Sequence, residues 1–195
     1  MYLPLNYKFL DDEFEYTGDE LRPHFVLEKT KIYGSTIIAW IGPCSVKTQS
    51  LVDMEDRLAN DSICARKMLH FLAEFYGTTL ESGVLYQRLL AQTAVDSLFS
   101  HGLAICRKGD DLMIKTHGVN IADTTDQLGK LSVSICTKGQ NSVLLHFAIN
   151  IDADGAPGHV KVADLNSLLR WNAKQIKEFA NRLAAQYIDE VTSIQ

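Results

Sequence analysis

The sequence predicts an α+β fold in which a mostly antiparallel sheet is packed by helices. Short runs of alternating apolar and polar residues are typical of strands, and longer apolar runs with helical spacing lie beside them. Turn residues separate several neighbouring strands closely enough for hairpins, which favours antiparallel pairing. The composition, with 46% hydrophobic and 22% charged residues, is ordinary for a globular protein. We therefore expect a single α+β domain over residues 1–195.

The first half of the chain is expected to contain an irregular segment, a strand and two helices. Residues 1–29 include an acidic stretch around Gly18 and predict an irregular surface segment. Residues 30–41 are rich in β-branched and aromatic residues, which favours a strand. Residues 62–76 form a strongly apolar run that we interpret as a helix, and residues 82–100 carry apolar positions at helical spacing.

The second half predicts a short hairpin, a longer hairpin and two helices. Residues 103–107 and 111–115 read as short strands joined by a Lys-Gly-Asp turn, with a polar connection over residues 116–129. Residues 162–170 suggest a short helix. The last helix, residues 172–194, has one apolar stripe with a 3.6-residue period. This stripe suits docking on the protein's own sheet, which we favour, or pairing with a second copy in a homodimer.

The segment from residue 130 to residue 151 is the most informative part of the chain. It predicts two strands around the polar turn TKGQN, with apolar residues alternating along both strands. A register that keeps the apolar side chains together places five polar side chains on the opposite face of the sheet: Lys130, Ser132, Ser134, His146 and Asn150. This polar face predicts a binding site for a polar or anionic small molecule.

Lys130 is the first candidate for a catalytic residue. An ammonium group that faces a cleft can hold a phosphate or stabilise a developing acyl oxyanion. The alternative is a solvated lysine at a sheet edge. His146 is the second candidate, as a general base or an orienting donor. Ser132, Ser134 and Asn150 are predicted to bind the substrate.

The short hairpin carries the other charged candidates. Arg107 offers bidentate geometry for a phosphate or a carboxylate. Asp110 and Asp111 are predicted to bind a magnesium ion that accompanies a nucleotide. The alternative is an ordinary charged turn, where glycine and aspartate are expected.

The remaining histidine and cysteine positions favour structural roles. His70 lies within an apolar run, which indicates a hydrogen-bonded core histidine, and no histidine pair has the spacing of a metal site on one helix. Cys44 follows a Gly-Pro pair, and Cys136 is predicted to lie near His146. Either thiol is a candidate nucleophile, although a small buried thiol is the simpler interpretation.

Charge and apolar patterning argue against several classes of protein. The net charge of −5 disfavours a general nucleic-acid-binding protein, which needs a basic face. The four cysteines form no CxxC pair, which disfavours a zinc ribbon or a redox motif. No apolar run has transmembrane length and no secretory segment opens the chain. We therefore expect a cytoplasmic protein with reduced thiols and no membrane contact.

Five segments spread over most of the chain carry a family resemblance. They are AWIGPCSV at 39–46, MLHFLAEFYG at 68–77, YQRLL at 86–90, RKGDDL at 107–112, and KLSVSI followed by LLHFAIN. Together they resemble domain-of-unknown-function family 366, which is bacterial and archaeal. That resemblance implies no particular activity.

The long hairpin also resembles the core of the biotin and lipoate protein ligases. Lys130 opens one strand and Ile149-Asn150 ends the next, and residues 107–115 stand where that family has an acidic residue and an apolar strand. The resemblance implies an α+β core related to class II aminoacyl-tRNA synthetases. It also implies that Lys130 contacts phosphate and acyl oxygens, with ATP and magnesium as cofactors. The glycine- and arginine-rich loop that closes over the adenylate in biotin ligases has no counterpart here.

These observations lead to one functional hypothesis and two alternatives. We expect a ligase- or transferase-like enzyme that binds a nucleotide or an acyl-type anionic small molecule on the polar sheet face. The missing arginine-rich loop favours a non-catalytic module that binds a small molecule. The apolar stripe of the last helix favours an interaction protein that acts through oligomer assembly.

Overall fold

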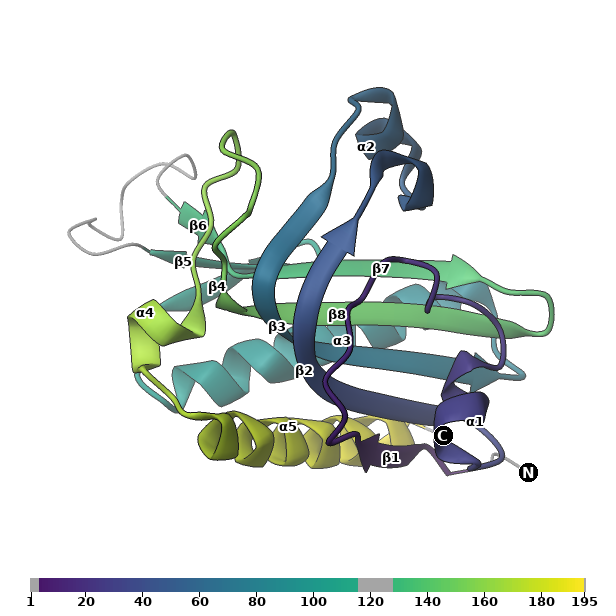
Figure 1. Cartoon of the computed structure of the whole chain (residues 1–195). Coiled ribbons are helices and arrows are strands. Elements are labelled where there is room, and N and C mark those ends of the chain that lie inside the picture. Colours follow the sequence, from purple (N-terminus) through teal and green to yellow (C-terminus); the bar gives the residue numbers. More distant parts are fainter. Residues whose placement is uncertain (1–3, 116–127, 195) are drawn as a thin grey trace.

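The chain forms two β-sheets. A computed structural model describes residues 4–115 and 128–194 (Figure 1). The larger sheet has five strands in the order β1-β2-β3-β8-β7. Its strands are β1 (Asn6–Phe9), β2 (Thr36–Val46), β3 (Ile63–Tyr76), β7 (Ser132–Lys138) and β8 (Ser142–Asp152). The β1–β2 pair is parallel and the other pairs are antiparallel, which confirms the predicted mostly antiparallel α+β class.

The smaller sheet has three antiparallel strands and lies beside the end of β7. Its strands are β4 (Ile105–Lys108), β5 (Asp111–Lys115) and β6 (Leu128–Lys130). The first two confirm the predicted short hairpin. A polar connection was expected over residues 116–129. Residues 116–127 of it lie outside the described residues.

Two long helices cover one face of the larger sheet. The helices are α1 (Phe25–Thr30), α2 (Met54–Leu58), α3 (Leu80–Phe99), α4 (Leu165–Leu169) and α5 (Ala173–Ser193), and the 3-10 turn η1 (Thr48–Ser50) precedes α2. Figure 1 shows α3 and α5 packed against the same side of the sheet. Within residues 4–115 and 128–194, no helix has both the length and the apolar character needed to cross a bilayer.

The last helix, α5, docks on the protein's own fold. Asn172 begins it with a capping box, in which its side chain accepts from the N–H of Gln175 and its own N–H is bound by the Gln175 side chain. The apolar stripe is buried against the sheet and α3: Ile176, Phe179, Ala180, Leu183, Ala184, Tyr187 and Val191. The preferred prediction for this stripe is therefore confirmed, and the homodimer stays a prediction.

Residues 62–76 do not form a helix, so that prediction is wrong. They form β3, the central strand of the larger sheet, between β2 and β8. Its side chains are buried on both faces, because helices cover one face and the N-terminal segment covers the other. A strand covered on both faces has a continuous apolar run instead of an alternation, and such a run resembles a buried helix.

The predicted long hairpin is present only from residue 132 onward. Lys130 ends β6 in the smaller sheet, and the chain changes sheets at Leu131. The Lys130 N–H donates to the carbonyl of Lys161 (2.8 Å) and the Lys130 carbonyl accepts from Ala163 N–H (3.0 Å). The Leu131 N–H donates to the carbonyl of Leu112 in β5 (2.8 Å). Lys130 is thus separated from the strand on which it was expected.

The single polar sheet face was also predicted in the wrong register. Ser132 is paired with Ile149 and Ser134 with Phe147, which places both serines on the helix-covered face. His146 is paired with Ile135 and points to the opposite face. Both faces of β7 are partly covered, so its apolar alternation did not identify the buried side.

The N-terminal segment covers the second face of the larger sheet. It was predicted to be irregular, but it contains β1 and α1 as well as the extended stretch between them. Its side chains join Trp40, Met68 and Leu72 of the sheet in a second core cluster. Phe14 stacks on Trp40 (ring centroids 4.5 Å apart), and the indole N–H donates to the Phe14 carbonyl (3.0 Å). This layer forms one wall of the cavities described next.

Candidate functional site

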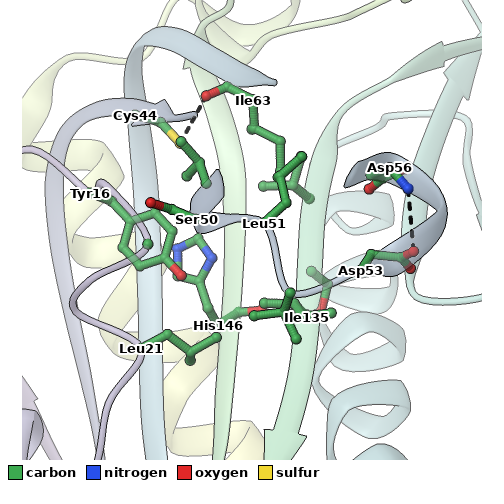
Figure 2. Close-up of a pocket in the computed structure, with 15 residues that line it drawn as sticks. Tyr16, Leu21, Cys44, Ser50, Leu51, Asp53, Asp56, Ile63, Ile135 and His146 are labelled. Atoms are coloured by element: carbon green, nitrogen blue, oxygen red, sulfur yellow. Dashed lines mark hydrogen bonds between the residues drawn. The ribbon is translucent and has the colours of Figure 1, made fainter. Parts of the chain in front are cut away.

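Two neighbouring cavities lie beside the second face of the larger sheet, next to the segment that joins β2 to β3. The first, of ≈ 80 Å³, is lined mainly by Tyr16, Cys44, Leu51, Ile63, Ile135 and His146 (Figure 2), and we call it the apolar cavity. The second, of ≈ 150 Å³, is lined by Asp56, Asp61, Lys130, Ser132, Ser134 and Asn150 among others, and we call it the polar cavity. Both contain Asp56, Ile63, Val133 and Ser134 in their walls, so the two cavities adjoin.

Tyr16 and His146 form a stacked pair at the wall of the apolar cavity. The backbone of Tyr16 bridges to β2, because its N–H donates to the carbonyl of Pro43 and its carbonyl accepts from Ser45 N–H (both 2.9 Å). Its ring lies parallel to the imidazole of His146, with centroids 3.7 Å apart (Figure 2). Burial raises the pKa of the Tyr16 hydroxyl, so this group stays protonated.

His146 continues into a buried chain of hydrogen bonds. Its Nε2 lies 3.1 Å from Nδ1 of His70, and Nε2 of His70 lies 3.2 Å from the carbonyl oxygen of Gly42. Burial lowers the pKa of His70 to about 4, and burial together with His70 lowers the pKa of His146 well below its usual value. Both imidazoles are therefore neutral at pH 7. His70 is a hydrogen-bonded core histidine, as predicted, but its pairing with His146 was not expected.

The two candidate thiols are not activated. Burial raises the pKa of Cys44 to about 12, and its Sγ lies 4.0 Å from the carbonyl of Ile63. Burial also raises the pKa of Cys136 to about 11. Cys136 is paired with Leu145 and faces the helices, so the expected Cys136–His146 proximity is wrong. Thiols with raised pKa values remain protonated at neutral pH and are poor nucleophiles.

Lys130 provides the cationic group of the polar cavity. Its Nζ lies 3.0 Å from Oδ2 of Asp111, and its side chain is 34% exposed. Burial and the carboxylates of Asp53 and Asp61 raise the pKa of Asp56, and the charge of Lys130 opposes this shift. The ammonium group of Lys130 thus lies between the carboxylate of Asp111 and the acidic segment that contains Asp56, and part of the lysine side chain is exposed.

The predicted polar ligands of the substrate are mostly engaged within the protein. The Ser132 hydroxyl accepts from the N–H of Leu112 (2.8 Å), and that of Ser134 accepts from Nε2 of Gln87 (2.8 Å). Asn150 donates from Nδ2 to the carbonyls of Ala163 (3.0 Å) and Lys130 (3.3 Å). These three residues line the polar cavity together with Lys130, but their hydrogen bonds hold the two sheets and the segment after β8 in place.

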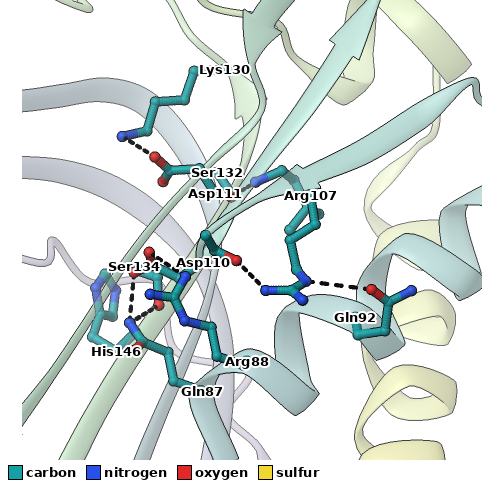
Figure 3. A network of polar contacts seen from close by, with 12 residues as sticks. Gln87, Arg88, Gln92, Arg107, Asp110, Asp111, Lys130, Ser132, Ser134 and His146 are labelled. Carbon is teal, nitrogen blue, oxygen red and sulfur yellow. Dashed lines mark hydrogen bonds and ion pairs between the residues drawn. The ribbon is translucent and has the colours of Figure 1, made fainter. Parts of the chain in front are cut away.

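The charged residues of the β4–β5 hairpin diverge from one another (Figure 3). Arg107 is exposed, contacts Gln92 and the carbonyl of Gly109, and is absent from the walls of both cavities. Asp110 accepts from Gln87 (2.7 Å) and Arg88 (2.9 Å), whereas Asp111 pairs with Lys130. The structure thus brings Lys130 and Asp111 together, without Arg107.

A bound magnesium ion at Asp110 and Asp111 stays a prediction. The two carboxylates are held by different cations, Asp110 by Arg88 and Asp111 by Lys130. In the described ranges, no group of three or more histidine, cysteine, aspartate or glutamate side chains is arranged to hold a metal ion. A magnesium ion that arrives with a phosphate would need only one or two protein carboxylates.

Asn150→Ala is expected to reduce the free energy of unfolding by about 2 kcal/mol, because two buried carbonyls lose a donor and a cavity remains. Asn150 is buried, and its amide joins β8 to the backbone of Lys130 and Ala163. Urea unfolding measures the change. Asn166→Ala, at an exposed position of α4, serves as the control and is expected to change stability little. Equal stability of Asn150→Ala and the wild type would contradict the structural role given to this amide.

The geometry described above is that of the biotin and lipoate protein ligase fold. A bi-partite lipoate protein ligase from Thermoplasma acidophilum matches with a TM-score of 0.61 and 14% identity, over 95% of this chain and 84% of that one. A biotin protein ligase from Aquifex aeolicus in complex with biotin and ATP matches with a TM-score of 0.56 and 11% identity, over 95% and 71%. Likenesses at these identities establish the fold alone.

The similarity is greater to two other proteins. A protein of unknown function from Pyrococcus horikoshi matches with a TM-score of 0.84 and 25% identity, over 97% of this chain and 94% of that one. An uncharacterised protein of Methanocaldococcus jannaschii is 28% identical over 192 residues, which are 96% of this chain and 80% of that protein. The model of the family described as Domain of unknown function (DUF366) matches residues 5–195. The chain therefore belongs to the DUF366 family, as its sequence resemblance predicted.

Proposed function

We propose that this protein is a ligase- or transferase-like enzyme that binds a small carboxylic acid across the two adjoining cavities. The observation that carries the proposal is the position of Lys130. Its ammonium group lines a polar cavity that adjoins an apolar one, and a single carboxylate, Asp111, holds it within 3.0 Å. An acid of this kind would place its carboxylate at Lys130 and its apolar part toward Tyr16 and His146.

The structural relatives support a carboxylic acid as the class of ligand. The biotin protein ligase from Aquifex aeolicus was solved with biotin and ATP. A putative lipoate protein ligase from T. acidophilum was solved with bound lipoic acid, and this chain matches it with a TM-score of 0.57 at 13% identity, over 97% of this chain and 87% of that one. Biotin and lipoic acid are both carboxylic acids in which an alkyl chain joins a sulfur-containing ring to a terminal carboxylate. In the sequence resemblance, Lys130 stands where these ligases have the lysine that opens a central strand.

The walls of the cavities fit a carboxylate better than a triphosphate. Asp53, Asp56 and Asp61 line them, with Lys130 as the cationic side chain, and no arginine is found among the described lining residues. Several phosphate charges beside three carboxylates would be repelled unless a cation accompanied them. ATP with magnesium is therefore the second ligand to test. The same acidic wall favours the second candidate function, a module that binds a small acid without turning it over.

Lys130→Ala is expected to weaken the binding of lipoic acid or octanoic acid roughly 10- to 100-fold, because a charge-assisted hydrogen bond is lost. Titration calorimetry on the wild type and the variant measures this change. Lys174→Ala, at an exposed position of α5, is the matched control and should bind as the wild type does. Lys130→Arg keeps the charge beside Asp111 and should retain part of the affinity. Unchanged binding in Lys130→Ala would refute the proposed carboxylate site.

Turnover separates the enzyme from the binding module. The wild type is incubated with an acid that binds, with ATP, magnesium and labelled pyrophosphate. Acid-dependent exchange of label into ATP would support ligase-type chemistry, in which the acid is activated as an adenylate. Binding of the acid without exchange, and without transfer from an acyl thioester, would favour the module.

A further inference from the structure

The hydrogen-bond chain beneath the apolar cavity has a defined direction. It begins at the carbonyl oxygen of Gly42, which can only accept. The Nε2 atom of His70 must therefore carry the proton, and Nδ1 of the same neutral ring is left as an acceptor. The Nε2 atom of His146 must then donate to it across 3.1 Å. In a neutral imidazole one nitrogen carries the proton, so Nδ1 of His146 has a free lone pair.

This Nδ1 atom opens onto the apolar cavity. His146 is a cavity-lining residue that is only 2% exposed. Its Nε2 contacts His70 and its ring face contacts Tyr16, and no described residue hydrogen-bonds to Nδ1. Within the described residues, no enclosed side-chain nitrogen or oxygen lacks a partner, so Nδ1 is in reach of the cavity space. Figure 2 shows the imidazole edge facing the space between Leu51 and Ile135.

The lone pair lies in a cavity with many apolar residues in its wall. Leu51, Ile63, Val133 and Ile135 are among them. The Tyr16 hydroxyl and the Cys44 thiol stay protonated, so the carboxylates in the wall of this cavity are those of Asp53 and Asp56. A ligand that fills the cavity shields this acceptor from water, and it must then supply a hydrogen-bond donor or leave the acceptor unpaired at a cost in free energy. A site of this type discriminates strongly against analogues that lack the donor.

We infer that the apolar cavity binds a ligand group that donates an N–H or O–H hydrogen bond to Nδ1 of His146. The inference rests on the proposed function where it names the substrate class: a carboxylic acid whose apolar end carries one hydrogen-bond donor. The volume of ≈ 80 Å³ limits the size of this end. It is about half of a cavity that holds benzene, so a group smaller than a benzene ring is expected.

The first experiment reads the tautomers of the wild-type protein by two-bond ¹H–¹⁵N correlation spectra of the histidine side chains. Both His70 and His146 should carry the proton on Nε2 and show an unprotonated Nδ1 at pH 7. A proton on Nδ1 of His146 would overturn the inference, because this atom could then no longer accept.

The second experiment titrates the wild type with pyrrole and with furan. The two rings match in size and shape, but only pyrrole has an N–H donor. Pyrrole is expected to bind roughly 3- to 10-fold more tightly, which is the effect of one hydrogen bond, and to shift the Nδ1 resonance of His146. Equal affinity for the two rings, or no binding of either, would overturn the inference.

Two substitutions test whether Nδ1 of His146 is the atom that causes the preference for pyrrole over furan. His146→Gln can place its amide nitrogen near the site of Nε2 and keep the contact with His70, but it removes the acceptor at Nδ1, so the preference for pyrrole should vanish. His146→Asn places an amide oxygen near the former Nδ1 and should restore part of the preference. A preference that persists in His146→Gln would contradict the role of Nδ1. If either variant fails to fold, the tautomers and the pyrrole-to-furan ratio of the wild type still decide.

The failures of the two proposals are distinguishable, because pyrrole and furan are uncharged and do not depend on Lys130. Loss of acid binding with an intact preference for pyrrole would refute the carboxylate site alone. Acid binding that depends on Lys130, without a preference for pyrrole, would refute the inference about His146 alone.

Discussion

Lowering the pH from 7 to 5 is expected to remove about 2 kcal/mol or more from the free energy of unfolding, through the buried pair His70 and His146. Burial lowers the pKa of His70 from 6.5 to about 4 in the folded protein, which alone corresponds to about 2 kcal/mol at pH 5. The pKa of His146 is lowered in the same direction, by burial and by the neighbouring His70. The two rings are hydrogen-bonded to each other, so the protonation of one affects the protonation of the other.

The sign follows from proton counting. Between pH 6.5 and about 4 the unfolded chain protonates both histidines, whereas the folded protein keeps them neutral. The unfolded state then binds more protons, so stability rises with pH in this window and is lost as the pH falls through it. Above pH 6.5 neither state is protonated and the effect disappears. Asp56 and Asp110, whose pKa values are raised by burial, act weakly in the opposite sense.

Urea unfolding at pH 7, 6 and 5 measures this effect. The double variant His70→Gln/His146→Gln should lose most of the pH dependence in this window, whatever its absolute stability. His159→Gln changes an exposed histidine and should keep the wild-type slope. A flat stability between pH 7 and 5 in the wild type would show that the two imidazoles are not buried as neutral rings.

Gly42→Ala is expected to lower the free energy of unfolding by about 3 kcal/mol or more, because an added methyl group has no room. A Cβ atom at Gly42 would lie 2.1 Å from the carbonyl oxygen of Phe14 and 3.2 Å from the indole nitrogen of Trp40. The first of these atoms is backbone and cannot rotate away. The N-terminal segment would have to move off β2, and with it Tyr16 from its stack on His146.

Two measurements test this second prediction. Urea unfolding gives the loss of stability, and titration with pyrrole should show weakened binding because a wall of the apolar cavity moves. Gly158→Ala is the control, since a Cβ atom there would meet nothing within 4 Å. Equal stabilities of the two variants would show that the N-terminal segment does not press on β2 at Gly42.

Local signals in the sequence were sufficient for several elements. The two long helices on the sheet, α3 and α5, follow from the helical spacing of their apolar residues, and the β4–β5 hairpin follows from two short strands around a glycine turn. These features depend on neighbours within a few residues along the chain. The fold class and the family resemblance were predicted from the same kind of information and are confirmed.

The candidate site was predicted in part. Lys130, Ser132, Ser134 and Asn150 do line one cavity, as a shared site requires. They reach it from two sheets instead of one face of a hairpin, because the chain changes sheets at Leu131. The side chain of His146 lies on the same face of β8 as that of Asn150, opposite to the side chains of Ser132 and Ser134, and it lines the neighbouring apolar cavity.

Local patterns along the chain are enough to predict the α+β class, the two long helices and the short hairpin. The tertiary fold was needed to show that residues 62–76 are the central strand and that His70 of this strand contacts His146. A strand that is covered on both faces is apolar along its whole length, so no alternation of apolar and polar residues identifies it as a strand. Its buried polar residues find partners on other strands, and His70 and His146 are 76 residues apart in the sequence. The proton order that leaves Nδ1 of His146 free depends on that contact and on the carbonyl of Gly42, which no local pattern specifies.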